Sequence, residues 1–578
     1  MNGAEVLLRT LVEEGVDVCF ANPGTSEMQF VAALDRVPAM RGVLALFEGV
    51  ATGAADGYGR MTGSPAATLL HLGPGMANGI ANLHNARRAR TPLVNLVGDH
   101  ATYHQVYDAP LQSDIRSLAT PVSGYYSSVP RVEDMAWLAR EAVAAALGPP
   151  GRVATLVVPA DLTWTEVPGS VPPIGPQARA GSGEHRAVGR RKPPPGIAPA
   201  RSRVEDARVE EIAGILAAAS RVPGGSGGSG GAASAGEVTI LIGGGALRER
   251  GLSASALVAA RSGARLYCET FPARIERGGG LPEVQRLAYL AELAGAQLDG
   301  TRHLVLVDAK APVSFFAYPG KPSSLVPDGC VLHELAGGGD DSEDALERLA
   351  DALEGLGCRS AAGIGAGGIG AGGIGAGGAG VRRPTAARPE PPSGPLSASL
   401  LAAAIGAVLP EGAIVSDEGN TAGLFVAGAT ADGPPHDWLC LTGGAIGQGL
   451  PLATGAAVAC PDRPVLCLEA DGSAMYSTQA LWTQAREGLN VTTVVLANRS
   501  YAVLEMELDR VGAGARGPLA ASMLDIANPE LNFVRLAEGM GVEACRVSDA
   551  KDLTLALERA FAEPGPHLVE AVLPRGLS

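Results

Sequence analysis

Short apolar runs alternate with segments of helical periodicity over residues 1–168. The runs are Val16–Phe20, Gly42–Phe47, Ala66–His71, Thr91–Val97 and Val153–Val158. Alternation of this kind is typical of strand–helix–strand units on a parallel sheet. We therefore predict a first α/β domain over residues 1–168.

The same pattern returns in two further blocks, at 205–357 and 396–578. The strongest predicted strands of the second block are Val238–Ile242 and His303–Val307. Those of the third block are Ala413–Ser416, Val465–Leu468, Val491–Ala497 and His567–Val572. The whole pattern predicts an α/β protein with three doubly wound domains and mainly parallel sheets.

Two compositional breaks separate the blocks. Residues 169–204 are rich in proline, glycine and arginine, and residues 358–395 contain a Gly-Ile-Gly-Ala-Gly repeat followed by prolines. Such segments have too few side chains to form a core, so we expect linkers. A glycine–serine run, Gly224–Ser229, is expected to be a flexible tether before the strand Val238–Ile242.

Composition excludes several classes of protein. The net charge of -15 over 578 residues argues against nucleic-acid binding, because phosphate backbones select basic surfaces. The eight cysteines form no C-x-x-C pair, so neither a zinc site nor a disulfide framework is indicated. With no signal-peptide pattern and no apolar run of about 18 residues, we expect a cytoplasmic protein that does not bind membranes.

Candidate metal ligands follow two predicted strands of the third block. Asp471-Gly472-Ser473 comes after Val465–Leu468, and Asn498 comes after Val491–Ala497. Each motif alone is an ordinary turn sequence, but ligands of open α/β sheets bind at the carboxyl ends of strands. Carboxylate and amide oxygens suit Mg²⁺, which also keeps water or phosphate oxygens. Two glycine-rich turns, Glu418–Thr421 and Thr442–Gly447, could complete a cradle for a diphosphate.

These residues resemble the diphosphate motif of thiamine diphosphate-dependent enzymes, which reads Gly-Asp-Gly-Ser, a gap, then Asn-Asn. Here Ala470 and Ala497 replace the first residue of each half. The resemblance implies that Mg²⁺ is held by Asp471, Asn498 and the carbonyl of Ser500. It also implies cofactor contacts from Gly419, Asn420, Gly444, Gly472, Ser473 and Tyr501, with Ile446 as the apolar wedge that bends thiamine diphosphate.

The segment Glu48–Arg60 resembles the family signature that begins with glutamate and ends Asp-Gly-Tyr-Ala-Arg, with Gly59 in place of the alanine. A glutamate that starts a helix is often only a favourable partner of the helix dipole. The resemblance instead implies that Glu48 hydrogen-bonds the aminopyrimidine ring and so activates the cofactor.

Two loops of the first block resemble those of benzoylformate decarboxylase. They are Asn22-Pro23-Gly24-Thr25 and His71-Leu72-Gly73-Pro74-Gly75. The resemblance implies that Thr25 orients the substrate carboxylate and that His71 transfers protons, a role that suits the neutral-range titration of histidine. A purely structural histidine is the alternative, and His100 and His104 could line the same entrance.

The sequence as a whole most resembles acetolactate synthase large subunits, but it differs from them at two places. Residues 501–509 lack the tryptophan of such synthases, and His71 is a decarboxylase-like residue. We therefore expect a 2-oxo-acid decarboxylase or carboligase, with a benzoylformate-type decarboxylase or a non-catalytic cofactor-binding subunit as alternatives. The glycine-interrupted central block weakens the case for the flavin (FAD) of synthases, and no G-x-G-x-x-G supports a dehydrogenase. The resemblance implies a homodimer or homotetramer, with each site shared by the first block of one subunit and the third of another.

Overall fold

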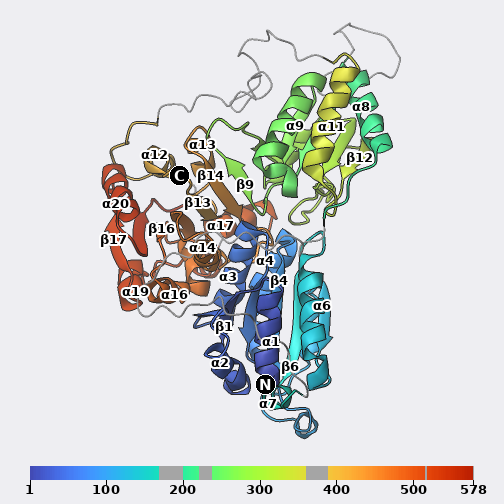
Figure 1. Ribbon diagram of the computed structural model, residues 1–578. Helices are drawn as coiled ribbons and strands as arrows, with labels where there is room; N and C mark the ends of the chain where they lie inside the picture. Colours follow the sequence, from blue (N-terminus) through green and yellow to red (C-terminus); the bar gives the residue numbers. More distant parts are fainter. Residues whose placement is uncertain (168–199, 221–236, 359–387, 515–516, 577–578) are drawn as a thin grey trace.

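The computed structural model describes residues 1–167, 200–220, 237–358, 388–514 and 517–576. Three sheets follow one another along the chain, each flanked by helices (Figure 1). Most of the expected linkers, and the Gly224–Ser229 tether, lie outside the described residues. No helix in the described parts of the chain is both long and apolar enough to cross a lipid bilayer.

The first sheet has six parallel strands in the order β2-β1-β3-β4-β6-β5. Its strands are β1 (Val18–Asn22), β2 (Arg41–Leu44), β3 (Ala66–Leu70), β4 (Leu93–Asp99), β5 (Tyr125–Ser128) and β6 (Val153–Pro159). Its helices are α1 (Gly3–Glu13), α2 (Met28–Leu34), α3 (Glu48–Thr62), α4 (Leu72–Ala89), α5 (Ile115–Ala119), α6 (Met135–Leu147) and α7 (Ala160–Trp164). The strand order reverses between β1 and β3, where parallel sheets of this kind bind their ligands.

The central sheet has five parallel strands in the order β10-β8-β7-β11-β12. They are β7 (Val238–Ile242), β8 (Arg265–Cys268), β10 (Gln285–Arg286), β11 (His303–Val307) and β12 (Val331–Ala336). The helices are α8 (Asp206–Ser220), α9 (Glu249–Ser262), α10 (Ala291–Leu298) and α11 (Ser342–Gly355). Here the order reverses between β7 and β11.

The third sheet has the order β17-β18-β16-β15-β13-β14-β9. Its strands are β13 (Ile414–Glu418), β14 (His436–Cys440), β15 (Val465–Ala470), β16 (Val491–Ala497), β17 (Glu543–Val547) and β18 (His567–Val572), with β9 (Ile275–Arg277) at one edge. Its helices are α12 (Ala398–Val408), α13 (Val426–Ala429), α14 (Gly449–Ala459), α15 (Asp471–Ser477), α16 (Ala480–Glu487), α17 (Ala502–Arg510), α18 (Pro518–Ser522), α19 (Phe533–Gly539) and α20 (Ala550–Ala562). The reversal lies between β13 and β15.

The antiparallel strand β9 comes from the central block of the sequence. It pairs with β14 through Ile275 opposite Trp438, and it is the one strand in the described sheets that runs antiparallel. The sequence pattern gave no sign that the third sheet borrows a strand from the central block. The predicted fold class, with three mainly parallel α/β domains, is otherwise confirmed.

The first and third sheets are joined by helices α3 and α14, which cross closely. The position where a Cβ on Gly57 would lie is 2.1 Å from the carbonyl oxygen of Leu452, and that of Gly455 is 1.8 Å from the carbonyl oxygen of Ala54. Only glycine fits at both points, because any side chain would force the helix backbones apart. Buried residues of the two domains consequently form one continuous hydrophobic cluster.

Candidate functional site

The reversal point of the third sheet carries the predicted metal ligands. Asp471 opens α15 directly after β15, and Asn498 follows β16. One Asp471 oxygen accepts the amide of Gly472 at 2.9 Å, and the other accepts the amide of Arg499 at 2.6 Å. Burial raises the pKa of Asp471 to about 6, although these two amides oppose the rise.

Loop 498–500 faces the same carboxylate. The amide of Ser500 donates to the Asn498 side-chain oxygen at 3.1 Å, and Asn498 and Ser500 are both buried. Arg499 has a left-handed backbone with a φ of 58°, which turns its amide toward Asp471. The fold thus gathers a carboxylate and an amide oxygen at one point, with the main chain of Ser500 beside them. Oxygen donors of this kind are those that Mg²⁺ prefers.

The predicted diphosphate residues surround this point. Asn420, with a left-handed φ of 47°, follows β13 and donates to the Ser473 hydroxyl at 3.2 Å. Gly472 lies against the Tyr501 ring, since a Cβ on Gly472 would be 2.4 Å from Tyr501 Cε1. The structure therefore brings Asn420, Gly472, Ser473 and Tyr501 together, while Gly419 lies at the carboxyl end of β13 beside Asn420.

A buried glutamate that the sequence analysis did not single out fixes the glycine-rich loop. Glu418 accepts the amide of Gly447 at 2.7 Å and that of Gly449 at 2.5 Å. Burial raises the pKa of Glu418 to about 7, against these hydrogen bonds and one from Ser473. Glu418 thus holds the end of the loop that carries Gly444 and Ile446.

The reversal point of the first sheet carries the other predicted residues. Glu48 begins α3 and is buried, and its carboxylate accepts the Asn78 side-chain amide at 3.0 Å. His71 follows β3 and precedes α4. A Cβ on Gly75 would be 3.1 Å from Glu48 Oε1 and 3.4 Å from His71 Cβ, so Glu48 and His71 flank the same glycine.

His71 has a partner that the sequence analysis missed. Its Nδ1 lies 2.7 Å from Glu27 Oε2 and 3.2 Å from the Ser26 hydroxyl. Glu27 is buried and also accepts the amide of Gly24 at 2.8 Å. A carboxylate beside Nδ1 favours the tautomer in which Nδ1 carries the proton and leaves Nε2 available. Thr25 is exposed in the same loop, next to Ser26.

An aromatic cluster from the central block lies beside the glycine-rich loop. A Cβ on Gly444 would be 2.6 Å from Phe315 Cζ. The Phe315 ring packs against Phe271, Tyr289 and Phe316 at centroid distances of 5.8, 5.3 and 4.9 Å. No sequence motif links these rings to Gly444, because the residues lie more than a hundred positions apart.

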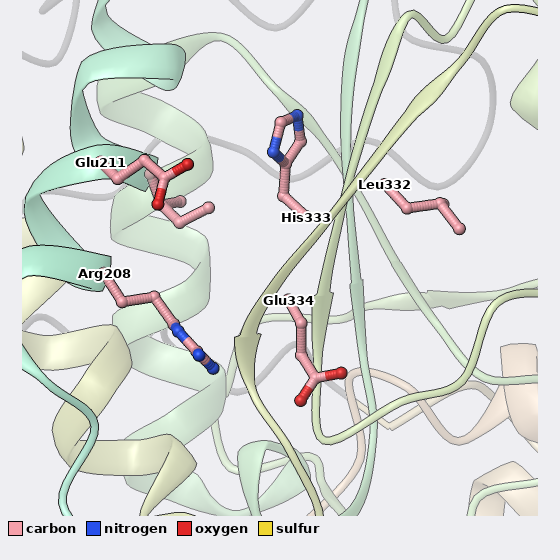
Figure 2. Close-up of a pocket in the computed structure, with 6 residues that line it drawn as sticks. Arg208, Glu211, Leu332, His333 and Glu334 are labelled. Carbon is pink, nitrogen blue, oxygen red and sulfur yellow. The ribbon is translucent and has the colours of Figure 1, made fainter.

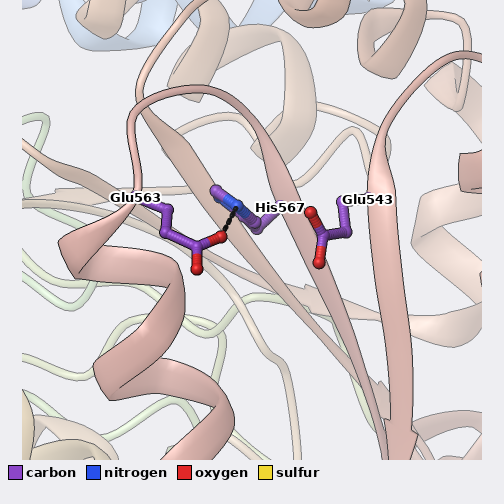
Figure 3. Close-up of side chains that lie close together, drawn as sticks. All are labelled: Glu543, Glu563 and His567. Atoms are coloured by element: carbon purple, nitrogen blue, oxygen red, sulfur yellow. Dashed lines mark ion pairs between the residues drawn. The ribbon is translucent and has the colours of Figure 1, made fainter.

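Two other polar clusters lie away from the carboxyl ends of the strands. Figure 2 shows a hollow between α8 and β12, where Arg208 and Glu211 face His333 and Glu334 across the flank of the central domain. Glu543, Glu563 and His567 lie close together in Figure 3, with ligand atoms within 4.8 Å of one another.

The two carboxylates of the Figure 3 cluster already share a cation. Arg559 donates to Glu543 at 2.6 Å and to Glu563 at 3.0 Å, so one guanidinium occupies both carboxylates. Glu543 and His567 begin their strands, which places the cluster at the amino edge of the sheet, opposite Asp471. Ligands of such sheets bind at the other edge.

The fold and the polar side chains after its strands are those of an α/β protein with candidate ligand sites at two sheets, and comparison with known proteins identifies the family. Residues 1–119 match the model of the thiamine pyrophosphate enzyme N-terminal TPP binding domain, and residues 419–571 match that of the C-terminal TPP binding domain. Thiamine pyrophosphate is another name for thiamine diphosphate. The chain belongs to this family, and the predicted family is confirmed.

Known proteins align with this chain over nearly its whole length. The chain is 52% identical over 575 residues to a Mycobacterium tuberculosis protein named "Putative acetolactate synthase large subunit IlvX", covering 99% of each chain. It is 27% identical to benzoylformate decarboxylase of Pseudomonas aeruginosa, covering 97% of this chain and 96% of that protein. Among solved structures, a thiamine diphosphate-dependent 4-hydroxybenzoylformate decarboxylase of Rhodococcus jostii matches the fold with a TM-score of 0.76, at 23% identity and over 100% of both chains.

Proposed function

We propose that the protein is a thiamine diphosphate- and Mg²⁺-dependent decarboxylase or carboligase of 2-oxo acids. One observation carries the proposal: the Asp471–Asn498 group and the Glu48–His71 group occupy the equivalent reversal points of two similar sheets. Family membership and the similarity to both acetolactate synthase and benzoylformate decarboxylase support the same reaction class.

The residues at the third sheet fit the metal and the diphosphate. Asp471 keeps unshared oxygen lone pairs after accepting two amides, and a bound cation would offset the burial that raises its pKa. Asp471, Asn498 and the Ser500 carbonyl would hold Mg²⁺, which readily takes phosphate oxygens as further ligands. The cofactor contacts would come from Gly419, Asn420, Gly444, Gly472, Ser473 and Tyr501, with Ile446 as the wedge.

When bound, the cofactor supplies the thiazolium ring that stabilises a carbanion. The residues of the chain would do the remaining work. Glu48 would hold a proton against the pyrimidine ring, and its burial keeps water from competing for that hydrogen bond. Thr25 would orient the substrate carboxylate. His71, oriented by Glu27, would give and take protons at Nε2.

We further propose that each site is shared by two chains, and contacts along α4 are compatible with this arrangement. The Glu48 carboxylate contacts α4 at Asn78, whereas the loop that carries Ile446 contacts it at Asn85, which donates to the Ala445 carbonyl at 2.8 Å. Seven residues of helix separate these contacts by about 10 Å. The family resemblance implies that Glu48 of one chain serves the cofactor held at Ile446 of another, so we infer at least a homodimer.

Apolar side chains beside both groups support this inference. Leu424, Phe425, Met475, Tyr476 and Leu504 are exposed around the third-sheet residues. Leu46, two residues before Glu48, is exposed, as are Tyr103, Val106 and Tyr107 in the segment after β4. Extended apolar surface of this kind on a folded protein marks a contact with another chain or ligand. Joining the two faces in a symmetric pair would cover both and bring Glu48 of one chain to Ile446 of the other.

The aromatic cluster favours a second candidate, a benzoylformate-type decarboxylase. Phe315 lies against Gly444, next to the expected wedge Ile446, and the rings of Phe271, Tyr289 and Phe316 extend from it. Such a wall suits a 2-oxo acid with an aryl group, since aromatic pairs prefer edge-to-face packing.

The test is an assay of the purified protein, with thiamine diphosphate and Mg²⁺, over aliphatic and aryl 2-oxo acids. Release of CO₂ with formation of an aldehyde or acyloin is expected, and Glu48→Gln should abolish it. If no 2-oxo acid is consumed by a protein that binds the cofactor, the non-catalytic subunit becomes the better interpretation. If Glu48→Gln keeps full turnover, the assigned role of Glu48 is wrong.

A further inference from the structure

The central sheet has a reversal point of the same kind as the other two. Strand order changes between β7 and β11, and Gly243-Gly244-Gly245 follows β7. In open α/β sheets this crevice binds phosphates through the amides of the glycine-rich turn. A dinucleotide such as FAD would place its diphosphate there.

The crevice is occupied by a side chain of the protein itself. Asp308 follows β11, and its carboxylate accepts the amide of Gly245 at 2.9 Å. The missing Cβ of Gly244 would lie 2.0 Å from Asp308 Oδ2, so glycine is needed for the carboxylate to enter. Asp308 itself has a left-handed φ of 50°, and its side chain is only 2% exposed.

A second carboxylate lies beside the same turn. Glu269, just after β8, lies against the turn, since a Cβ on Gly243 would be 3.1 Å from Glu269 Oε1. Burial raises the pKa of Glu269 to about 7, and the nearby charge of Asp308 adds to the rise. One amide of the turn is therefore already bound to a carboxylate, and a second carboxylate lies beside the turn.

Two arginines balance this negative charge. Arg90, the residue after α4 of the first domain, forms an ion pair with Asp308 Oδ1, and Arg201 Nη1 lies 3.5 Å from Oδ2. The Arg90 guanidinium also lies against the loop after β12, since a Cβ on Gly338 would be 2.3 Å from its Nη1. The first domain thus inserts a cation into the crevice of the central domain.

We propose that this crevice is an anion site whose permanent occupant is the Asp308 carboxylate. A diphosphate would have to expel Asp308 and then lie beside two buried carboxylates, which a low-dielectric crevice strongly disfavours. The residues present therefore do not fit FAD or another dinucleotide. The Arg90–Asp308 pair instead fastens the first domain to the central one.

The direct test uses the wild-type holoenzyme. Protein saturated with thiamine diphosphate and Mg²⁺ is incubated with FAD and passed through a desalting column. We expect no visible flavin absorbance to remain with the protein. Retention of flavin in a one-to-one ratio would overturn the proposal.

A variant tests whether Asp308 stands where a phosphate would bind. Asp308→Asn keeps the size of the side chain and tolerates the left-handed backbone, but it removes the charge and with it the ion pairs to Arg90 and Arg201. With the cofactor site saturated, calorimetric titration with inorganic pyrophosphate should show at least about tenfold tighter binding than in wild type, because two cations then lose the carboxylate they share.

Asp328→Asn is the matched control, on an exposed turn of the same domain, and its pyrophosphate affinity should equal that of wild type. Adding Arg90→Met to Asp308→Asn should reverse the gain. Equal pyrophosphate affinity in Asp308→Asn and wild type would contradict the proposal. If Asp308→Asn fails to fold, the flavin experiment still decides the matter.

Discussion

The carboxyl edges of the third and central sheets differ in what satisfies their loop amides. Both sheets reverse their strand order at one point and place glycine-rich turns there. In the third sheet, Asp471 is held by two amides and faces Asn498, with exposed apolar residues around it. In the central sheet, Asp308 binds the turn, Glu269 lies beside it, and Arg90 and Arg201 form ion pairs with Asp308.

The difference teaches that a fold with a ligand crevice is not evidence of a ligand. A buried carboxylate whose hydrogen bonds come from backbone amides, as those of Asp471 do, can still bind a metal or another partner. A buried carboxylate that already forms ion pairs with arginine, as Asp308 does, needs no metal or ligand to balance its charge. The predictions below test this contrast, starting with the largest effect.

Asp471→Ala should abolish activity and cofactor binding, since it removes the charged ligand of the proposed metal. Loss of an outer-shell partner alone typically costs 10–100-fold in metal affinity, so we expect more than about 100-fold here. Calorimetric titration with thiamine diphosphate in the presence of Mg²⁺ measures it. Asp462→Ala, exposed at the opposite edge of the sheet, is the control and should bind normally.

Glu48→Gln should lower kcat by roughly 10²–10⁴-fold, the usual contribution of a positioned acid or base, while cofactor binding persists. Mixing Glu48→Gln subunits with Asp471→Ala subunits, after dissociation and reassociation, tests whether sites are shared. Random pairing in a two-fold dimer leaves about a quarter of the sites intact. No recovery of activity from a mixture that does form dimers would place the whole site in one chain.

Glu27→Gln should reduce kcat by roughly 10–100-fold with little change in KM, because His71 loses the charge that orients it. Ser26→Ala removes the longer contact to the same nitrogen and should have a smaller effect. Unchanged cofactor affinity and unfolding temperature separate this positioning role from a structural one. A drop in stability with normal turnover per folded molecule would argue for the structural role.

Mg²⁺ affinity should depend on pH through Asp471. Because burial raises its pKa to about 6, the metal must displace a proton below that pH, and affinity should fall about tenfold per pH unit. The metal-free folded protein binds this proton more tightly than the unfolded chain does. Its free energy of unfolding should therefore fall as pH rises from about 4 to about 6. Flat Mg²⁺ affinity from pH 5 to 7 would contradict the assignment.

Arg90→Met should lower the unfolding temperature by several degrees, since it leaves the buried Asp308 carboxylate with Arg201 alone. The loss should shrink when Arg90→Met is made in the Asp308→Asn background, because coupled residues do not act additively. Differential scanning calorimetry of the four proteins measures the coupling. Fully additive shifts would show that the two side chains do not depend on each other.

Strands with continuous buried apolar runs were predictable from sequence. Val238–Ile242, His303–Val307, Val491–Ala497 and His567–Val572 have the predicted limits. The edge strands β5 and β17 were missed, because they are largely exposed or half-buried and show no apolar run. Strand β9 was missed for another reason: its pairing with β14 joins residues about 160 positions apart, which no local pattern encodes.

The residues of the candidate site also fall into those that the sequence predicted and those that it did not. Motifs on loops after strands pointed to Asp471, Asn498, Glu48 and His71, and the structure gathers these residues in two groups. Their assigned roles stay predictions. Glu27 belongs to no motif, although a glutamate two residues after Thr25 could have drawn attention as a partner for His71. The contact of Phe315 with Gly444 depends on the packing of two domains and could not be predicted.

The borrowed strand β9 limits how this enzyme can be rebuilt. A chimera that exchanges the whole central block for that of a relative would also exchange the edge of the neighbouring sheet, because Ile275 pairs with Trp438 there. A chimera should therefore retain residues 275–277 of this protein and replace only the parts of the central block before and after them. The same restriction applies to natural recombination: the central and third blocks share a sheet and cannot be exchanged as independent modules.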